Sequence, residues 1–394
     1  MSHRTNRALS AWALSCLVFF AACTGGDDPG PDAGASESPI VEPELSVTTP
    51  PPIFGAADRV LNVAIPEPAT LDPMRISDPG ASLIARQLYE GLTMWDPVLE
   101  KVKPAAAESW TSSPDGKTFT FKLRQGMSFH DGSPVTASDF IFAFDRIALK
   151  ANASDLAYLL QDVVGFDAVN GSGTSGHLTG LRAPDDLTLV IQLSRPYQDL
   201  PALLTHPALV PLPRRAVEDT NKFLTQPTGN GPFQIAQPWS PGQSVILKAF
   251  AGFINTPDLD GIRFLAYPDA ASSWIDFVKG NVDVSEVPAG QVADASRRFG
   301  EQGFVPFLKA EYIGVNLADG ALKNPTLRKA INLAIDRGAI ARTIYNGTLE
   351  PPRGIVPAGL PGFEENLCVD LCRYAPDTAR ALVRKLPRAD RKVS

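Results

Sequence analysis

The stretch "KTFTFKLRQGMSFHDGSPVTASDFIFAFDRIAL" (residues 117–149) contains the patterns of a strand, a tight turn and a helix in direct succession. Residues 117–123 alternate polar and apolar side chains, which is typical of a strand with one buried face. Thr136 and Asp139 then form a capping-box-like helix start. An apolar stripe at helical spacing follows, made of Phe140, Phe144 and Ile147. A strand followed at once by a helix indicates an α/β or α+β domain.

His130, Asp131 and Gly132 lie between this strand and this helix, where a catalytic pair and a simple turn are the two interpretations. Asp-Gly is turn chemistry, because glycine tolerates positive φ and aspartate can bond to the backbone beyond it. A catalytic pair would need a nucleophile or a metal ligand nearby, and the sequence identifies none. We therefore interpret the triplet as a corner and predict that the chain has no catalytic residues and is not an enzyme.

Further strand and helix patterns lie on both sides of this stretch. Short apolar or alternating runs predict strands over residues 59–65 and 187–193. Apolar residues at helical spacing predict a helix over 81–92, a helix pair over 324–347 and a last helix over 375–386. The mixture, without internal repeats, extends the α/β assignment over the whole body of the chain.

The N-terminus has the pattern of a secretory signal over residues 1–22. Two arginines precede an apolar run that is shorter than the ~20 residues a membrane-spanning helix needs. The run ends in Phe20-Ala21-Ala22-Cys23, which resembles a bacterial lipobox, where the cysteine receives lipid. We predict lipidation at Cys23 and an extracytoplasmic, membrane-anchored protein at the cell surface or in the periplasm. Ordinary cleavage near Ala22 is the alternative.

Residues 23–58 are rich in glycine, proline, serine and acids, a composition that cannot bury enough apolar surface to fold. They are predicted to form a disordered tether between the membrane and the body. Removal of residues 1–22 takes away two arginines and no acids, which changes the formal net charge from −7 to −9. No basic cluster remains, so nucleic acid is not an expected partner.

Two further patterns bear on cofactors. Cys368 and Cys372 could form a disulfide outside the cytosol or remain free thiols, and no histidine lies near them to complete a metal site. The sequence "GSGTSG" (171–176) matches G-x-G-x-x-G but is neither preceded by a strand pattern nor followed by a helical stripe. We interpret it as a loop, and the sequence predicts neither a metal nor an organic cofactor.

Four segments occur in an order that is specific to one family. They are "LDPMRISDPGASLIARQLYEGLTMWDP", "PAAAESWTSSPDGKTFTFKLRQGMSFHDGSPVTASDFIFAFDRI", "GNGPFQIAQPWSPGQSVILKAF" and "LRKAINLAIDRGAI". Together they resemble the family 5 extracellular solute-binding proteins, the oligopeptide- and dipeptide-binding receptors of ABC importers. "LLTHPALVPLP" (203–213) is most similar to the oligopeptide branch.

This resemblance implies a two-lobed, periplasmic-binding-protein-like fold, type II-like with an extra subdomain, that closes on its ligand. Lobe I would comprise residues 59–92 and 214–308, and the extra subdomain residues 93–213. Lobe II would begin at residue 309 and is expected to be incomplete. Family members continue beyond the helix matched by "DTARALVRKL", so we expect residues 309–394 to be a truncated lobe that lacks a segment interleaved with both lobes.

The resemblance also implies a set of ligand-binding residues. They lie in the loop before the first helix, in "GNGPF", in "SEVP" and in "VNL": Ser77, Asp78, Ser82, Asn230, Gly231, Ser285, Glu286, Val287 and Asn316. In the family, the "SEVP" position pairs with the main chain of an extended peptide. The expected partners are therefore peptides and the membrane subunits of an ABC importer, and the protein is expected to be a monomer.

Three alternatives to peptide capture stay open at this point. The same scaffold could bind another solute, such as a metal chelate, a sugar or a signalling peptide, because a fold does not determine its ligand. The chain could be a truncated remnant that binds nothing. A secreted hydrolase is the third alternative, and it would need a nucleophile or metal constellation that the sequence does not show.

Overall fold

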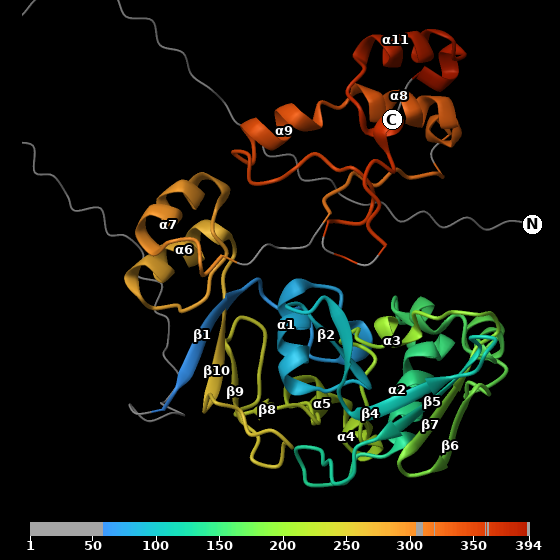
Figure 1. The fold of residues 1–394 in the computed structure, drawn as a ribbon, viewed down its shortest axis with the longest axis vertical. Coiled ribbons are helices and arrows are strands. Elements are labelled where there is room, and N and C mark those ends of the chain that lie inside the picture. The colour runs from blue at the N-terminus through green and yellow to red at the C-terminus, as the bar shows by residue number, and fades with distance from the viewer. Residues whose placement is uncertain (1–57, 305–309, 319, 359, 361, 392–394) are drawn as a thin grey trace, which may run out of the picture. The chain divides into compact units, whose positions relative to one another are not determined.

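The computed structural model describes residues 58–304, 310–318, 320–358, 360 and 362–391 (Figure 1). The predicted signal, Cys23 and nearly all of the predicted tether lie outside the described residues. The described part is an α/β structure with two four-stranded sheets, a two-stranded sheet and helices between them. This confirms the α/β fold class.

The first sheet has the strand order β1-β10-β9-β8. Strand β1 (Val60–Ile65) pairs in parallel with β10 (Gly261–Ala266), so strands separated by about half the chain lie side by side. Antiparallel pairing then adds β9 (Val245–Ala249) and β8 (Phe233–Ile235). The predicted strand over 59–65 is confirmed as β1, and it ends before "PEP" because proline cannot donate to a ladder.

The second sheet is antiparallel throughout, in the order β4-β5-β7-β6. Its strands are β4 (Ala107–Ser112), β5 (Thr118–Leu123), β7 (Thr188–Gln192) and β6 (Leu181–Asp185). The strands predicted over 117–123 and 187–193 are thus confirmed, and they are neighbours. A separate hairpin connects the two sheets in sequence and consists of β2 (Thr93–Asp96) and β3 (Lys101–Pro104).

Helix α2 (Ala137–Ala148) packs against β6 and β7 of the second sheet, as Figure 1 shows. Its predicted capping box is present, because the Thr136 N–H and hydroxyl both lie within 2.8 Å of the Asp139 carboxylate. The apolar stripe of the helix is buried, and Phe140 and Phe144 are fully enclosed. Besides α1, which is described next, the other α-helices of residues 58–304 are α3 (Leu200–Leu203), α4 (Arg214–Glu218), α5 (Thr220–Thr225), α6 (Ala270–Lys279) and α7 (Val292–Phe299).

The helix predicted over 81–92 exists, but its bounds were wrong at both ends. Helix α1 spans Pro79–Leu88, with Asp78 as its N-cap. Proline is well suited to the first helical position, where no N–H bond is required. The helix ends early because Tyr89 is extended, with φ −131° and ψ 150°. Residues 89–92 instead follow a path fixed by contacts with residues 229–231, described below.

One continuous hydrophobic core runs through residues 65–264 and includes side chains from both four-stranded sheets, α1 and α2. The second part of the chain comprises the described residues from 310 to 391. Its helices are α8 (Pro325–Ala334), α9 (Arg337–Thr343), α10 (Val369–Cys372) and α11 (Pro376–Arg384). Asn324 and Asp336 cap α8 and α9 as predicted. Helices α8 and α11 pack on each other through two small clusters of buried residues.

Candidate functional site

Two loops lie near the carboxyl end of β1. The chain leaves β1 at Ile65 and leads to α1, and Gly80 approaches the carbonyl of Pro66, directly after the strand. Val284 pairs in parallel with Val63, and the Ala64 N–H donates to its carbonyl at 2.9 Å. Residues 285–287 therefore extend past the same end of the sheet. Because open α/β sheets bind ligands beyond the carboxyl ends of their parallel strands, residues 77–82 and 285–287 define the candidate site.

In the loop before α1, most polar groups are used to start the helix. The Asp78 carboxylate accepts from the N–H of Ala81 at 2.7 Å and from that of Ala69 at 3.2 Å. The Ser82 hydroxyl donates to the Asp78 carbonyl at 2.9 Å, while Ser77 is exposed. Asp78 therefore shapes the loop, and Ser77 is the polar side chain of residues 77–82 that is most open to solvent.

The second loop has a similar division between inner and outer residues. Ser285 is partly buried, and its hydroxyl donates to the hydroxyl of Ser273 on α6 at 2.9 Å. Glu286 is exposed and Val287 is half-buried. The segment is fixed to β1 because the Asp283 carboxylate accepts from the main-chain N–H of Asn62 at 2.7 Å. An anchored segment of this kind can present its backbone to an extended ligand.

Asn230 and Gly231 occupy an interior position. Asn230 is only 3% exposed, and its amide accepts from the N–H of Glu90 and donates to the carbonyl of Glu90, both at 2.9 Å. A Cβ on Gly231 would lie 2.5 Å from the Gln87 carbonyl oxygen, and one on Gly229 would lie 2.0 Å from the Leu88 carbonyl oxygen. The two glycines permit close approach of two backbones. Ligand contact by Asn230 and Gly231 stays a prediction, and their contacts indicate packing.

His130, which lies between β5 and α2 in the sequence, contacts the same interior position. We call the contacts among residues 87–90, 130 and 229–231 the junction. The main-chain N–H of His130 donates to the Gly229 carbonyl at 2.8 Å, and the Gly229 N–H donates to His130 Nδ1 at 3.1 Å. Since Nδ1 accepts, Nε2 carries the proton and donates to the Gly231 carbonyl at 3.1 Å. Burial lowers the pKa of His130 to about 4. His130 is therefore neutral and holds residues 229–231 through hydrogen bonds, which agrees with its interpretation as a structural turn residue.

Glu90, a half-buried residue, completes the junction. Burial raises the pKa of Glu90 to about 7, and the positive charge of Arg124 opposes this rise only in part. Sequence patterns missed the roles of Glu90 and Gly229 and the contacts that His130 makes with residues 229 and 231, because these residues come from three segments distant in the chain. The paired glycines around Asn230 were the available signal, because glycines flanking a polar residue often mark close backbone approach.

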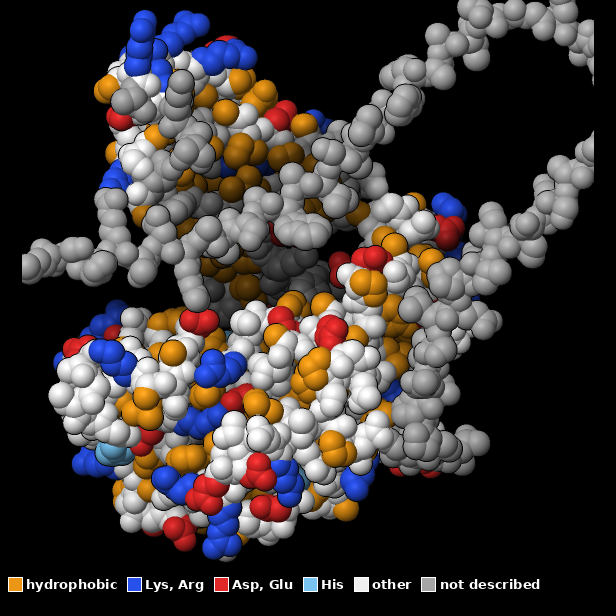
Figure 2. All heavy atoms as spheres, turned by 180° about the vertical axis from the view of Figure 1, so that it is seen from behind, with side chains coloured by type: hydrophobic (Ala, Val, Ile, Leu, Met, Phe, Trp, Pro, Cys, Tyr) orange, Lys and Arg blue, Asp and Glu red, His pale blue; other side chains and the backbone are white. Residues whose placement is uncertain are grey.

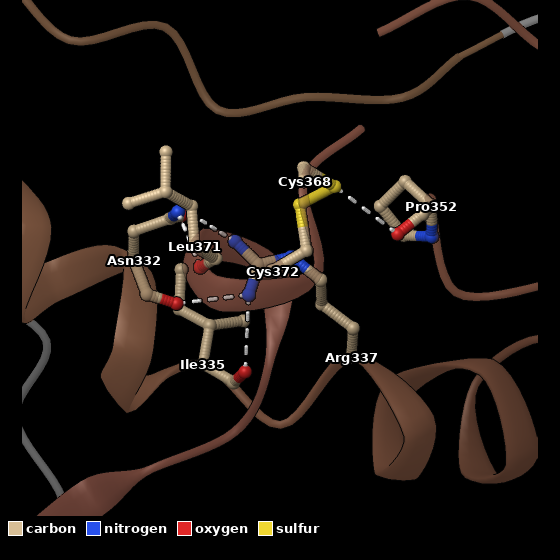
Figure 3. Close-up of a disulfide and its surroundings, with 7 residues drawn as sticks. All are labelled: Asn332, Ile335, Arg337, Pro352, Cys368, Leu371 and Cys372. Carbon is tan, nitrogen blue, oxygen red and sulfur yellow. Dashed lines mark hydrogen bonds between the residues drawn. A yellow bond between two sulfur atoms is a disulfide. The ribbon is translucent and has the colours of Figure 1, made fainter. Parts of the chain in front are cut away.

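The other predicted site residues lie in the second part of the chain. Asn316 lies in an exposed turn, where its side chain accepts from the Ala318 N–H at 2.9 Å. Cys368 and Cys372 form a disulfide across α10 (Figure 3). Beside it, Asn332 on α8 donates to the carbonyl of Leu371 at 2.7 Å, and Arg337 donates to the carbonyl of Asn332 at 2.8 Å. The disulfide thus belongs to a local network of the helical segment.

Within the described ranges, no group of three or more potential ligands could hold a metal ion. None of the helices in those ranges has both the length and the apolar character needed to cross a membrane. On the face shown in Figure 2, acidic, basic and apolar side chains are interspersed over the described surface.

The chain is similar to several proteins of known structure. OppA of Burkholderia pseudomallei superposes with a TM-score of 0.76 at 25% identity, over 84% of this chain and 67% of that one. OppA of Haemophilus influenzae in complex with the peptide RPPGFSPFR gives a TM-score of 0.73 at 25% identity, over 85% and 68%. These likenesses define the class of the fold, which is that of periplasmic binding proteins.

The family follows from the sequence itself. Residues 101–390 match the model of "Bacterial extracellular solute-binding proteins, family 5 Middle", and the chain belongs to this family. Among curated relatives, a probable deoxycholate-binding periplasmic protein of Escherichia coli is 29% identical over 305 residues, and OppA of H. influenzae is 31% identical over 314. The chain spans 56% and 55% of their lengths. Such relatives are named as binding proteins rather than enzymes.

Proposed function

We propose that this protein captures peptides outside the cytoplasm for an ABC importer. The observation that carries the proposal is the 31% identity with an oligopeptide-binding protein, whose own structure contains a bound peptide. The ligand would lie against residues 77–82 and 285–287 at the carboxyl end of the first sheet. Ser77, Asp78, Ser82, Ser285, Glu286 and Val287 are the candidate contacts there, and Asn316 is the candidate in the second part.

The physical basis would be hydrogen bonding to the peptide main chain. An extended peptide offers N–H and C=O groups at regular intervals, and an anchored strand-like segment can pair with them regardless of the peptide's side chains. Residues 284–287 suit this role, because Val284 is bridged to β1 while Glu286 remains exposed. Binding of this kind requires no covalent step, so no catalytic residue and no cofactor is proposed.

The proposed domain division follows the two sheets. Residues 59–92 and 214–308 would form lobe I, because they contribute all strands of the β1-β10-β9-β8 sheet. Residues 93–213, which contain the β4-β5-β7-β6 sheet, would form the extra subdomain, and lobe II would begin at residue 309. Cys23 would carry the lipid anchor, and the protein would act as a monomer that delivers its ligand to the importer's membrane subunits.

A second candidate ligand is a bile acid, because a relative 29% identical over 305 residues is named as a probable deoxycholate-binding protein. Glutathione, a tripeptide, falls within the peptide proposal, and a glutathione-binding protein is also 29% identical over 312 residues. The two candidates differ in what they demand of the site. A peptide needs backbone partners along its length, whereas a steroid needs mainly apolar walls.

The test is thermal unfolding of the purified chain with a pool of short peptides, with glutathione and with deoxycholate. A ligand present at a hundredfold excess over Kd stabilises the native state by about 2.7 kcal/mol, which raises the midpoint measurably. Peptides should raise it and deoxycholate should not. A shift with deoxycholate alone would favour the second candidate, and no shift with any of them would refute peptide capture by this chain.

A pair of variants locates the site. Ser77→Trp places a large side chain in the exposed part of the first loop and should abolish the peptide-induced shift. Ser109→Trp is the matched control, because Ser109 is also exposed but lies on β4 of the other sheet. If the peptide-induced shift were the same in both variants, residues 77–82 would not be part of the ligand site.

A further inference from the structure

Charge is divided unevenly along the chain. Residues 58–304 contain 20 lysines and arginines and 28 aspartates and glutamates, whereas residues 380–391 contain five basic residues and one acid. We call these five the basic cluster: Arg380, Arg384, Lys385, Arg388 and Arg391. Because the acids of the larger region dominate the total charge, the expectation that no basic cluster remains does not hold for this short stretch.

The basic cluster lies on α11 and on η7 (Arg388–Arg391), the short 3₁₀-helix that follows it. The apolar side of α11, with Ala379, Val383 and Leu386 after its end, packs in the small clusters shared with α8. All five basic residues are exposed. In Figure 2, several Lys and Arg side chains stand together at the end of the second part where Figure 1 labels α11. The packed side of the helix therefore holds the basic cluster toward solvent.

Little acidic charge opposes the basic cluster. Arg380 pairs with Asp377 at 2.6 Å, but both side chains are exposed, where an ion pair is weak. Arg384, Lys385 and Arg388 form no ion pair with any other residue in the ranges that the structure describes. These three charges are therefore available to a partner from outside the chain.

Arg391 brings the positive charges together at the C-terminal end of α11. Its guanidinium donates to the carbonyls of Leu386 and Arg384, both at 2.8 Å, and a cation is favoured at this end of a helix. The Asp390 carboxylate accepts from the side-chain amide of Asn324 at 3.1 Å, so it is directed toward the start of α8. The folded backbone thus fixes a cationic end on the second part.

The chemistry of the basic cluster fits an extended anionic surface. Residues 376–391 contain no aromatic side chain, so they lack the rings on which nucleic-acid bases stack. The apolar side of α11 is already packed, so contact with lipid would be electrostatic and would not require insertion. Each lysine or arginine close to an anionic bilayer strengthens binding about fivefold.

The predicted tether would bring such a surface within reach. A lipid on Cys23 would hold the chain at a bilayer, and residues 23–58 would span at most about 120 Å when fully extended. Charges attract over about 10 Å at 0.1 M salt, so a body confined in this way would meet the bilayer surface repeatedly.

We propose that the basic cluster binds the surface of the anchoring membrane through anionic lipid headgroups. This inference rests on the proposed lipid anchor at Cys23 and adds to it a second contact, which would turn α11 toward the bilayer. The contact would keep the second part of the chain near the plane in which the importer's membrane subunits lie.

The experiment measures binding of the chain to lipid vesicles by co-sedimentation. The chain begins at residue 23 and carries Cys23→Ser, so that neither the signal nor a lipid contributes. Vesicles of phosphatidylcholine alone are compared with vesicles that also contain the anionic lipid phosphatidylglycerol. The chain should bind only the anionic vesicles. Salt at about 1 M, which shortens the Debye length from about 10 Å to about 3 Å, should release it.

A triple variant tests the basic cluster directly. Arg384→Gln, Lys385→Gln and Arg388→Gln together should weaken binding to anionic vesicles about a hundredfold, at about fivefold for each charge. Because these side chains are exposed, the midpoint of thermal unfolding should stay unchanged. Arg391 is left in place, since it also bonds the end of α11.

The matched control removes three positive charges from exposed residues elsewhere. It combines Lys101→Gln, Lys222→Gln and Lys248→Gln, which lie within residues 58–304. The net charge of the control equals that of the first triple variant, so the comparison separates the basic cluster from the overall charge. The control should bind anionic vesicles as tightly as the unaltered chain.

Three results would overturn the inference. The first is that the variant of residues 384, 385 and 388 binds as tightly as the unaltered chain. The second is that the control weakens binding equally, which would assign the effect to overall charge. The third is that the basic cluster binds duplex DNA more tightly than anionic vesicles at the same salt, which would make nucleic acid its partner.

The lipid anchor is tested separately, by uptake of labelled fatty acid at Cys23 in bacterial cells. If Cys23 is labelled but the chain does not bind anionic vesicles, the basic cluster is no membrane contact and the anchor stands. If Cys23 is not labelled but vesicle binding depends on residues 384, 385 and 388, the anchor is wrong and the contact with anionic lipid stands.

Discussion

Residues 58–304 and the helical segment 321–391 are stabilised by cores of very different size. In the first, one continuous cluster includes dozens of buried side chains, among them six fully enclosed phenylalanines. In the second, two small clusters of buried residues lie around α8 and α11, one with Ala321, Leu327 and Leu386 and the other with Ala330, Leu333 and Ala379. Hydrophobic stabilisation grows with the apolar area removed from water, so the first region should be far more resistant to unfolding.

The two regions also differ in how their backbones are joined. The first has ladders between strands that are distant in sequence, such as β1 with β10. The second depends on local helical bonds and on contacts such as the one that Asn332 makes with Leu371. The comparison indicates that long-range pairing and a large core stabilise the candidate site, whereas the helical segment depends on a few contacts.

The largest expected effect comes from removing a ring in the large core. Phe121 is fully buried on β5, and its ring lies 6.2 Å from that of Trp110. Phe121→Ala should lower the free energy of unfolding by about 3–5 kcal/mol, whereas Leu327→Ala in a small cluster should cost about 2 kcal/mol. Urea unfolding with hydrogen exchange measures both changes.

The location of the changes distinguishes the regions. Phe121→Ala should reduce exchange protection across both four-stranded sheets, and Leu327→Ala should reduce it only within 321–391. If Leu327→Ala lowered protection of the sheets as much as Phe121→Ala does, the two regions would form one cooperative unit and the comparison would fail.

A smaller effect is expected at the junction of residues 87–90, 130 and 229–231. Gly229→Ala would place a Cβ 2.0 Å from the Leu88 carbonyl oxygen, a backbone atom that cannot rotate away. Overpacking of this kind costs about 1–3 kcal/mol. Gly176→Ala is the control, because Gly176 is exposed, has no atom within 4 Å of its Cβ position and needs no positive φ. If both variants lowered the midpoint of thermal unfolding equally, the argument from the close approach of the two backbones would be wrong.

Local patterns predicted the individual elements well. The capping box of Thr136 and Asp139, the caps at Asn324 and Asp336, and the alternation in residues 117–123 all lie within a few residues, and each produced the expected helix or strand. The two-lobed solute-binding fold was inferred from the order of sequence segments, because spacing alone does not determine which strands pair.

Long-range contacts could not be predicted from local patterns. Helix α1 ends at Leu88 rather than at residue 92, since Glu90 is bound by Asn230, which lies 140 residues away. His130 was correctly interpreted as a corner, but its bonds to Gly229 and Gly231 depend on tertiary structure. The burial that sets the pKa values of His130 and Glu90 likewise appears only once the chain is folded.

The smallest expected effect concerns pH at this junction. His130 has a pKa of about 4, below its ordinary 6.5, so its stabilisation is complete above pH 6.5 and decreases as pH falls toward 4. Glu90 has a pKa of about 7, above its ordinary 4.5, so its contribution is complete below pH 4.5 and decreases as pH rises toward 7. Between pH 4.5 and 6.5 the two slopes oppose each other, and the junction should contribute little net pH dependence.

Substitution of either residue should therefore reveal the slope of the other. Glu90→Gln should make the free energy of unfolding fall as pH decreases from 6.5 to 4.5, by at most about 1.4 kcal/mol per pH unit. His130→Asn, which keeps an acceptor for the Gly229 N–H, should produce the opposite slope. Urea unfolding at several pH values measures both, with the unaltered chain as reference. Identical slopes in all three proteins would contradict the burial of both groups.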